Sequence, residues 1–237
     1  MDSLTLTSST GRFVREARYL APPSPARKLA VFLDAEYYVE RMDAPSCIAG
    51  LQESGAIPPT ACLFISGHGE EARHHDYTCS DPFADFIAND VLPWLRKRNG
   101  VAAAADHLVA GVSLSGLQAV HTSLSHGHAI GLTLCQSGSF WWENEWLRRH
   151  LQEYPAAAGK YWLSVGSKEK GAGMVHPPTA MRQEIDQDTG VEHFSSALAA
   201  HGACIHTHRF DGGHDCNRWK EELPAALAWL LNPSPKI

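Results

Sequence analysis

Continuous apolar runs alternate along most of this chain with stretches whose apolar residues recur every three or four positions. An uninterrupted apolar run is typical of a strand covered on both faces, and the three-to-four spacing is typical of an amphipathic helix. The predicted strands are 13–20, 28–33, 60–65, 107–110, 129–135, 161–165 and 204–210. The predicted helices are 83–95, 117–124, 142–151, 191–201 and 221–231. Pro93 is expected to kink the first helix or to mark a boundary in it.

Strands that alternate with helices predict an α/β fold with a mostly parallel central sheet and helices on both faces. The chain has 237 residues, of which 44% are hydrophobic, enough for one large domain spanning 1–237. Within it, residues 1–27 supply an N-terminal strand and a proline-rich connection. In a sheet of this kind, function lies at the carboxyl ends of the strands.

Composition excludes several classes of function. A net charge of -6 makes nonspecific nucleic-acid binding a poor candidate, because phosphate contacts need clustered Lys and Arg. We expect no secretory signal and no membrane partner, since we find neither a basic start with an apolar core nor a bilayer-spanning apolar stretch. The six cysteines are scattered, so we expect free thiols and a reduced, cytoplasmic location. The oligomeric state stays unknown at this point.

Neither a metal nor a cofactor is indicated. None of the fourteen histidines pairs with a cysteine or carboxylate at a zinc-like spacing. Gly171-Ala172-Gly173 is not followed by the rest of a dinucleotide fingerprint.

The candidate nucleophile lies in the sequence Gly111-Val112-Ser113-Leu114-Ser115, between a predicted strand and a predicted helix. Small residues around a serine at a strand-to-helix turn are typical of a nucleophile elbow, where a strained turn lifts the hydroxyl above the sheet. Amides of the first helical turn favour negative charge at such a place. The pattern favours Ser113 as a nucleophile, and an ordinary turn serine remains the alternative.

A serine hydroxyl needs a neighbouring base to act as a nucleophile near neutral pH. His214 follows the last predicted strand on a glycine-rich turn, which is the chain order of hydrolases with this layout. The acid that orients the histidine is expected after the penultimate strand, where Glu169 is the first choice. The competing carboxylates are Glu184, Asp186 and Asp211. A serine–histidine pair without a firm acid also stays open.

An oxyanion needs two preorganised amide donors. One is expected from Leu114, the residue after the nucleophile. The other is expected from the loop after strand 28–33, with Glu36 as the first choice and Ala35 as the second.

Several further stretches carry a family resemblance. They are Leu-Asp-Ala-Glu-Tyr at 33–37, Gly-Ala-Ile-Pro-Pro at 55–59, the stretch 73–94, Gln-Ser-Gly-Ser-Phe-Trp-Trp at 136–142, and Asp-Gly-Gly-His-Asp at 211–215 with Trp219 behind it. Together they resemble the esterase D-like branch of the α/β-hydrolases, and most closely the catalytic domain of enterochelin (ferric enterobactin) esterases. The similarity runs from about residue 29 to the C-terminus.

The resemblance implies an α/β-hydrolase with Ser113 as nucleophile, His214 as base and Glu169 where related esterases have their acid. It implies a serine esterase acting on small-molecule carboxylic esters, with catecholate siderophore trilactones as the leading substrates. Ala35 and Ser115 stand where the family usually has glycine. The separate N-terminal domain of full-length enterochelin esterases has no counterpart in residues 1–237, which weakens the substrate assignment more than the chemistry. An acyltransferase using the same serine, or a catalytically silent ligand-binding relative, remains the alternative.

The segment 136–142 is expected to border the cleft, because it follows the strand next to the nucleophile strand. Phe140, Trp141 and Trp142 would form an aromatic wall for aryl groups of a substrate, and core packing is the alternative. Arg73 and Lys168 are candidates for binding an anionic group of the substrate, although solvated surface charge is the commoner role of such residues.

Overall fold

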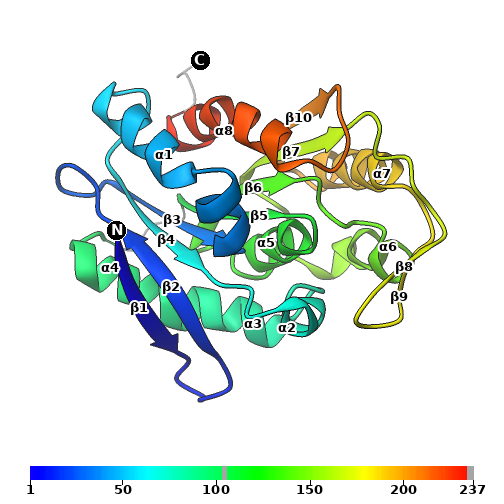
Figure 1. Cartoon of the computed structure of the whole chain (residues 1–237), viewed down its shortest axis with the longest axis horizontal. Helices are drawn as coiled ribbons and strands as arrows, with labels where there is room; N and C mark the ends of the chain where they lie inside the picture. The colour runs from blue at the N-terminus through cyan, green and yellow to red at the C-terminus, as the bar shows by residue number, and fades with distance from the viewer. Residues whose placement is uncertain (103–105, 234–237) are drawn as a thin grey trace.

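One eight-stranded sheet organises residues 1–102 and 106–233, which are the residues that the computed structural model describes (Figure 1). Its strands run in the order β1 (Asp2–Thr7), β2 (Val14–Leu20), β4 (Thr60–Ile65), β3 (Lys28–Leu33), β5 (His107–Val112), β6 (Ile130–Gln136), β7 (Lys160–Gly166) and β10 (Cys204–Phe210). β1 and β2 pair antiparallel with their neighbours, and the strands from β4 to β10 are parallel. The prediction of an α/β fold with a mostly parallel sheet is confirmed.

Helices cover both faces of this sheet, which explains why β4 and β5 are buried at every residue and lack polar alternation. One face packs against η1 (Glu36–Arg41), α1 (Ala44–Glu53) and α8 (Cys216–Leu231). The other face packs against α3 (Asp81–Asp85), η2 (Phe86–Val91), α4 (Leu92–Asn99), α5 (Leu114–Ser125), α6 (Trp142–Arg149) and α7 (Gln187–Ala200). Two further helices are short, namely α2 (Glu70–Asp76) and η3 (Leu151–Glu153).

The predicted helix 83–95 corresponds to three consecutive helical segments, α3, η2 and α4. Pro93 lies in the first turn of α4, just after the π-helical segment η2. The residue before the proline, Leu92, donates its N–H to the Ile87 carbonyl and closes the last π-helical turn, so Pro93 stands where the π-helical hydrogen-bond pattern ends. The boundary expected at Pro93 is therefore correct.

A small antiparallel hairpin lies outside the main sheet, in the connection between β7 and α7. It consists of β8 (Met174–His176) and β9 (Met181–Gln183), and β9 packs beside α6 (Figure 1). The sequence pattern did not indicate this hairpin, nor did it indicate β1, α1 or α2. The hairpin matters because it lies beside the carboxyl end of the sheet, where the candidate site is found.

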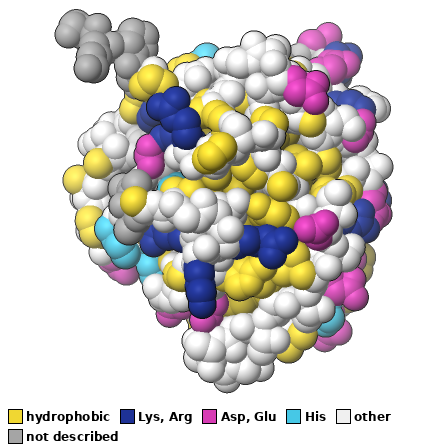
Figure 2. All heavy atoms as spheres, turned by 90° about the vertical axis from the view of Figure 1, so that its left-hand side faces the viewer, with side chains coloured by type: hydrophobic (Ala, Val, Ile, Leu, Met, Phe, Trp, Pro, Cys, Tyr) yellow, Lys and Arg dark blue, Asp and Glu magenta, His cyan; other side chains and the backbone are white. Residues whose placement is uncertain are grey.

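Basic and acidic side chains are interspersed on the face seen in Figure 2, on the side of the molecule where β1 and α4 lie. Arg98 of α4 pairs with Asp2 of β1, and Lys28 of β3 pairs with Asp106. None of the helices described is both long and apolar enough to cross a membrane.

Candidate active site

Ser113 lies in a tight turn between β5 and α5, with φ 55° and ψ -120°. This backbone conformation is strained for a residue with a side chain. The turn also requires Gly111, because a Cβ there would lie 2.1 Å from the carbonyl oxygen of Ser115. The Ser115 hydroxyl closes the turn, since its Oγ donates to the Val112 carbonyl (2.8 Å) and accepts from the Val112 amide (2.9 Å). A serine in place of the family's usual glycine therefore supports the elbow.

One cavity of about 360 Å³ brings together residues from three loops at the carboxyl ends of the strands. Ser113 and Leu114 come from the turn after β5, Glu169 from the loop after β7 and His214 from the loop after β10. Residues that are 45 to 101 positions apart in the chain thus line a single space, as the carboxyl ends of parallel strands allow.

His214 and Glu169 are joined by a hydrogen bond of 2.6 Å between Nδ1 of the imidazole and Oε2 of the carboxylate. The Glu169 side chain is 2% exposed, whereas that of His214 is 43% exposed. The other Glu169 oxygen, Oε1, accepts from the Ser137 hydroxyl (2.6 Å) and from the Gly166 amide (2.7 Å). Trp219 donates to the same Ser137 hydroxyl through its indole nitrogen (2.9 Å). The carboxylate is therefore fixed in one orientation before it meets the histidine.

The three competing carboxylates are engaged elsewhere. Glu184 pairs with Arg182, Asp186 accepts from the Thr189 amide at the start of α7, and Asp211 pairs with Lys168. Among these candidates, Glu169 is the one that contacts His214.

The two residues expected to supply oxyanion amides are placed differently. Leu114, at the start of α5, lines the cavity with Ser113. Glu36 and Ala35 are not among the described residues that line it, and they border a separate hollow beside β1 and β2. The Glu36 carboxylate accepts from the Ser66 hydroxyl and the Gly67 amide. The assignment of the Leu114 and Glu36 amides stays a prediction.

The expected aromatic wall is largely absent from the described part of the cavity. The prediction that Phe140 lines it is wrong, because Phe140 is 2% exposed and stacks on Phe194 of α7 with ring centroids 4.1 Å apart. Trp142 borders a different hollow, on the side of α6, and packs against Trp146. Trp141 does line the cavity, and its indole stacks on the His176 ring at 4.9 Å.

Arg73 and Lys168 both line the cavity, but each already has a carboxylate partner. Arg73 donates from Nε and Nη2 to the two oxygens of Asp34 and from Nη1 to Glu70, each at 2.8 Å. Burial lowers the pKa of Arg73, but the carboxylates of Asp34 and Glu70 outweigh it and the net shift is upward. Arg73 is therefore charged, and its guanidinium already binds two carboxylates of the protein.

Several cavity residues were not predicted from the sequence. Gln187 and the hairpin residues Met174, His176 and Gln183 line the space, and Ser137 supports Glu169 from beneath. Ser137 lies within the 136–142 motif, so this motif could have identified Ser137 as a site residue from the sequence. The hairpin gave no signal, because strands of three residues are too short to show a period. Within the described residues, no group of three or more His, Cys, Asp or Glu side chains is placed to hold a metal ion.

A buried carboxylate, Glu222 of α8, lies behind the site. Its Oε1 accepts from Gln136 Nε2 (2.7 Å) and Ser164 Oγ (2.6 Å), and these residues lie near the ends of β6 and β7. Burial raises the pKa of Glu222 from 4.5 to about 7, against the opposing effect of these hydrogen bonds. The neutral form of this carboxyl is therefore favoured in the folded state below that pH.

We expect Glu222 to make the stability of the protein depend on pH. Between pH 4.5 and about 7 the folded state binds more protons than the unfolded state, so the free energy of unfolding falls as the pH rises. The full effect is about 3 kcal/mol. Glu222→Gln should flatten this part of the pH dependence, measured as Tm from thermal unfolding. The exposed neighbour Glu221 is the matched control, and equal slopes in Glu222→Gln and Glu221→Gln would contradict the prediction.

Comparison with known proteins agrees with this geometry. The sheet order and the elbow after β5 define an α/β-hydrolase fold. A family model described as a putative esterase matches residues 14–230, so the chain belongs to this esterase family.

Individual relatives confirm the resemblance to enterochelin esterases. The chain is 31% identical over 208 residues to the iron(III) enterobactin esterase of Escherichia coli O6:H1, covering 87% of this chain and 50% of that protein. The enterobactin esterase of Shigella flexneri superposes with a TM-score of 0.83 at 24% identity, covering 97% of this chain and 58% of that one. A ferulic acid esterase superposes with a TM-score of 0.74 at 16% identity, covering 97% of both chains. The chain spans about half the length of the curated relatives it matches.

Proposed function

We propose that this chain is a serine esterase in which Ser113 is the nucleophile, His214 the general base and Glu169 the acid that orients the base. The observation that supports this proposal best is the 2.6 Å contact between His214 Nδ1 and Glu169 Oε2 in the cavity that Ser113 lines. The contact holds the Nδ1–H tautomer, which leaves Nε2 free to accept a proton.

In the first half of the reaction, the Ser113 hydroxyl attacks the ester carbonyl carbon while His214 Nε2 takes its proton. The carbonyl oxygen becomes an oxyanion, which the Leu114 amide and the positive end of α5 stabilise. Collapse of this intermediate breaks the ester bond, and His214 returns the proton to the departing alkoxide. An acyl group is left on Ser113.

In the second half, water attacks the acyl-enzyme carbonyl and gives its proton to His214. The bond between the acyl carbon and Ser113 Oγ then breaks, His214 returns the proton to Ser113, and the carboxylic acid is released. The Glu169 carboxylate stabilises the imidazolium that forms in both halves. Its three hydrogen-bond partners hold the carboxylate in place, so little reorganisation is needed when the charge appears.

Esters that carry aryl groups, catecholate siderophore esters and feruloyl esters among them, are the substrates we propose. The cavity volume falls within the range of about 300–1,000 Å³ that is usual for small-molecule sites. The His176 ring, which is partly exposed in the cavity and backed by the buried Trp141 indole, offers a flat surface against which an aryl group can lie. The enterobactin esterase and the ferulic acid esterase to which the chain is similar are named for esters of this class.

We also propose that residues 1–237 form a single domain in the cytoplasm. Strands from the beginning and the end of the chain share one sheet, which supports a single domain. The six cysteines, all within the described ranges, form no disulfide, which is compatible with a reducing compartment.

A fluorophosphonate probe tests the proposal directly, because it reacts with serines that a neighbouring base activates. We expect the probe to modify Ser113, identified by mass spectrometry of the labelled peptide, and to abolish hydrolysis of feruloyl and catecholate esters. Heat-unfolded protein is the control and should not be labelled. Labelling at another residue, or full activity after Ser113 is labelled, would overturn the assignment.

A further inference from the structure

The charged groups around the cavity indicate which substrate charge the cavity favours. Arg73 and Lys168 are the lysine and arginine side chains among the described residues that line it. Both are paired, Arg73 with Asp34 and Glu70, and Lys168 with Asp211 at 3.0 Å. A substrate anion entering the cavity would therefore meet cations whose charge is already balanced by carboxylates of the protein.

Arg73 is the more informative of the two because it is buried. Its side chain is 10% exposed, so its position is fixed, whereas Lys168 is 69% exposed at the rim. The Asp34 side chain is fully buried and takes two guanidinium nitrogens, which anchors Arg73 in the fold. The third nitrogen, Nη1, donates to Glu70, which is 62% exposed and lines the cavity.

Glu70 therefore differs from Asp34 in its importance for the fold. It comes from the start of the short helix α2, outside the sheet, and the fold does not need it to bury Arg73. Its carboxylate nevertheless neutralises the part of the guanidinium that faces the cavity. Removing that carboxylate would leave Nη1 free to bind an anionic group.

We propose that Glu70 is a specificity-determining residue that makes the Ser113 cavity select uncharged aryl esters over multiply anionic ones, such as iron(III) complexes of catecholate esters. Glu70 does so by engaging Arg73, which would otherwise attract the anion. This inference rests on the proposed esterase function and specifies its substrate class. Repulsion adds to the effect, since Glu70 itself and the net charge of -6 both disfavour the approach of an anion.

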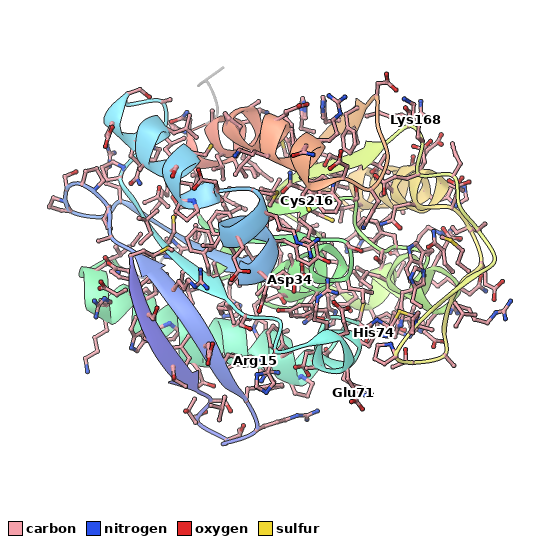
Figure 3. All side chains as sticks on the ribbon, viewed as in Figure 1. Arg15, Asp34, Glu71, His74, Lys168 and Cys216 are labelled. Atoms are coloured by element: carbon pink, nitrogen blue, oxygen red, sulfur yellow. The ribbon has the colours of Figure 1, made fainter. Side chains whose placement is uncertain are left out.

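Figure 3 shows how the neighbouring groups are arranged. Asp34 lies inside the molecule, His74 lies by the β8–β9 hairpin, and Glu71 of the same helix points outward into solvent. Glu71 does not line the described cavity, yet it carries the same charge on the adjacent residue. It is therefore a matched control for Glu70.

The experiment compares Glu70→Gln with Glu71→Gln on two pairs of substrates. One pair is 4-acetoxybenzamide and the anion 4-acetoxybenzoate, each with the acetate as its single ester bond, and the other is a catecholate trilactone without iron and its ferric complex. We expect Glu70→Gln to raise the ratio of kcat/KM for the anionic to the neutral member about tenfold, as removal of one nearby charge predicts. Glu71→Gln should leave the ratio within about twofold of the parent, and added salt should reduce the gain in Glu70→Gln.

The possible failures are distinguishable. If the parent and both variants hydrolyse the neutral esters but the ratio is the same in all three, Glu70 does not set the charge preference. If both variants raise the ratio equally, the effect is one of net charge and the role of Glu70 is likewise refuted. If the folded parent hydrolyses none of the four esters, the proposed function itself fails and the inference falls with it.

Discussion

Ser113→Ala is expected to lower kcat for ester hydrolysis by about 10,000-fold or more, because the acyl-enzyme can no longer form. The variant should remain folded, since alanine removes a single oxygen from a side chain that borders a cavity. Initial rates with a feruloyl ester, measured beside the parent at one protein concentration, give the result. Ser125→Ala, at the other end of α5, is the control and should keep the parental rate.

A second hydroxyl near Ser113 is an alternative nucleophile that this experiment has to test. Ser139 Oγ lies 3.3 Å from Ser113 Oγ and could in principle replace it as nucleophile. Ser139 is completely buried, however, whereas Ser113 is partly exposed in the elbow conformation. We therefore expect no rescue by Ser139. Residual activity above about a tenth of the parent in Ser113→Ala, lost again in the double variant with Ser139→Ala, would assign the chemistry to Ser139 instead.

The parts of the fold that the sequence predicted have long apolar patterns. Strands such as β3 and β4 are covered on both faces, so nearly all of their six residues are apolar. Such a run can be recognised in the sequence. β1 has only one buried residue and pairs at the edge of the sheet, so its sequence carries little pattern. Helix α2 is highly charged, and its existence depends on tertiary contacts rather than on an apolar stripe.

The same distinction applies to the candidate site. Ser113, Glu169 and His214 could be proposed because a tight turn and the chain order of the loops restrict which residue types can occupy those positions. The direction of a side chain is set by packing, which a single sequence does not reveal. Phe140 therefore faces α7 while its neighbour Trp141 faces the cavity. The pairing of Arg73 with Asp34, which is 39 residues away, could not be predicted from the sequence for the same reason.

Glu169→Gln is the second change for which we expect a large effect, a fall in kcat of about 10,000-fold near neutral pH. The reason lies in the hydrogen bonds of the carboxylate. Glu169 Oε1 accepts from the Gly166 amide at 2.7 Å, and a backbone N–H can only donate. The glutamine must therefore turn its carbonyl oxygen toward Gly166, which leaves its NH₂ group facing His214.

That orientation presents the histidine with a donor instead of an acceptor. Nδ1 would lose its proton to become an acceptor, the proton would move to Nε2, and Nε2 could no longer take a proton from Ser113. The substitution changes few atoms, so Tm should change little while kcat collapses. Stopped assays from pH 6 to 10 would measure the loss, and Glu184→Gln, whose carboxylate pairs with Arg182, is the matched control.

A small loss in Glu169→Gln would be as informative as a large one. If kcat fell less than about tenfold, the histidine would be oriented without a carboxylate, and the site would work as a serine–histidine pair. The edge-on contact of the His214 ring with Trp219, at 4.8 Å between centroids, would then be the contact that holds the imidazole. Trp219→Leu would separate the two cases, since it should cost more than Glu169→Gln in a serine–histidine pair and less where the carboxylate sets the tautomer.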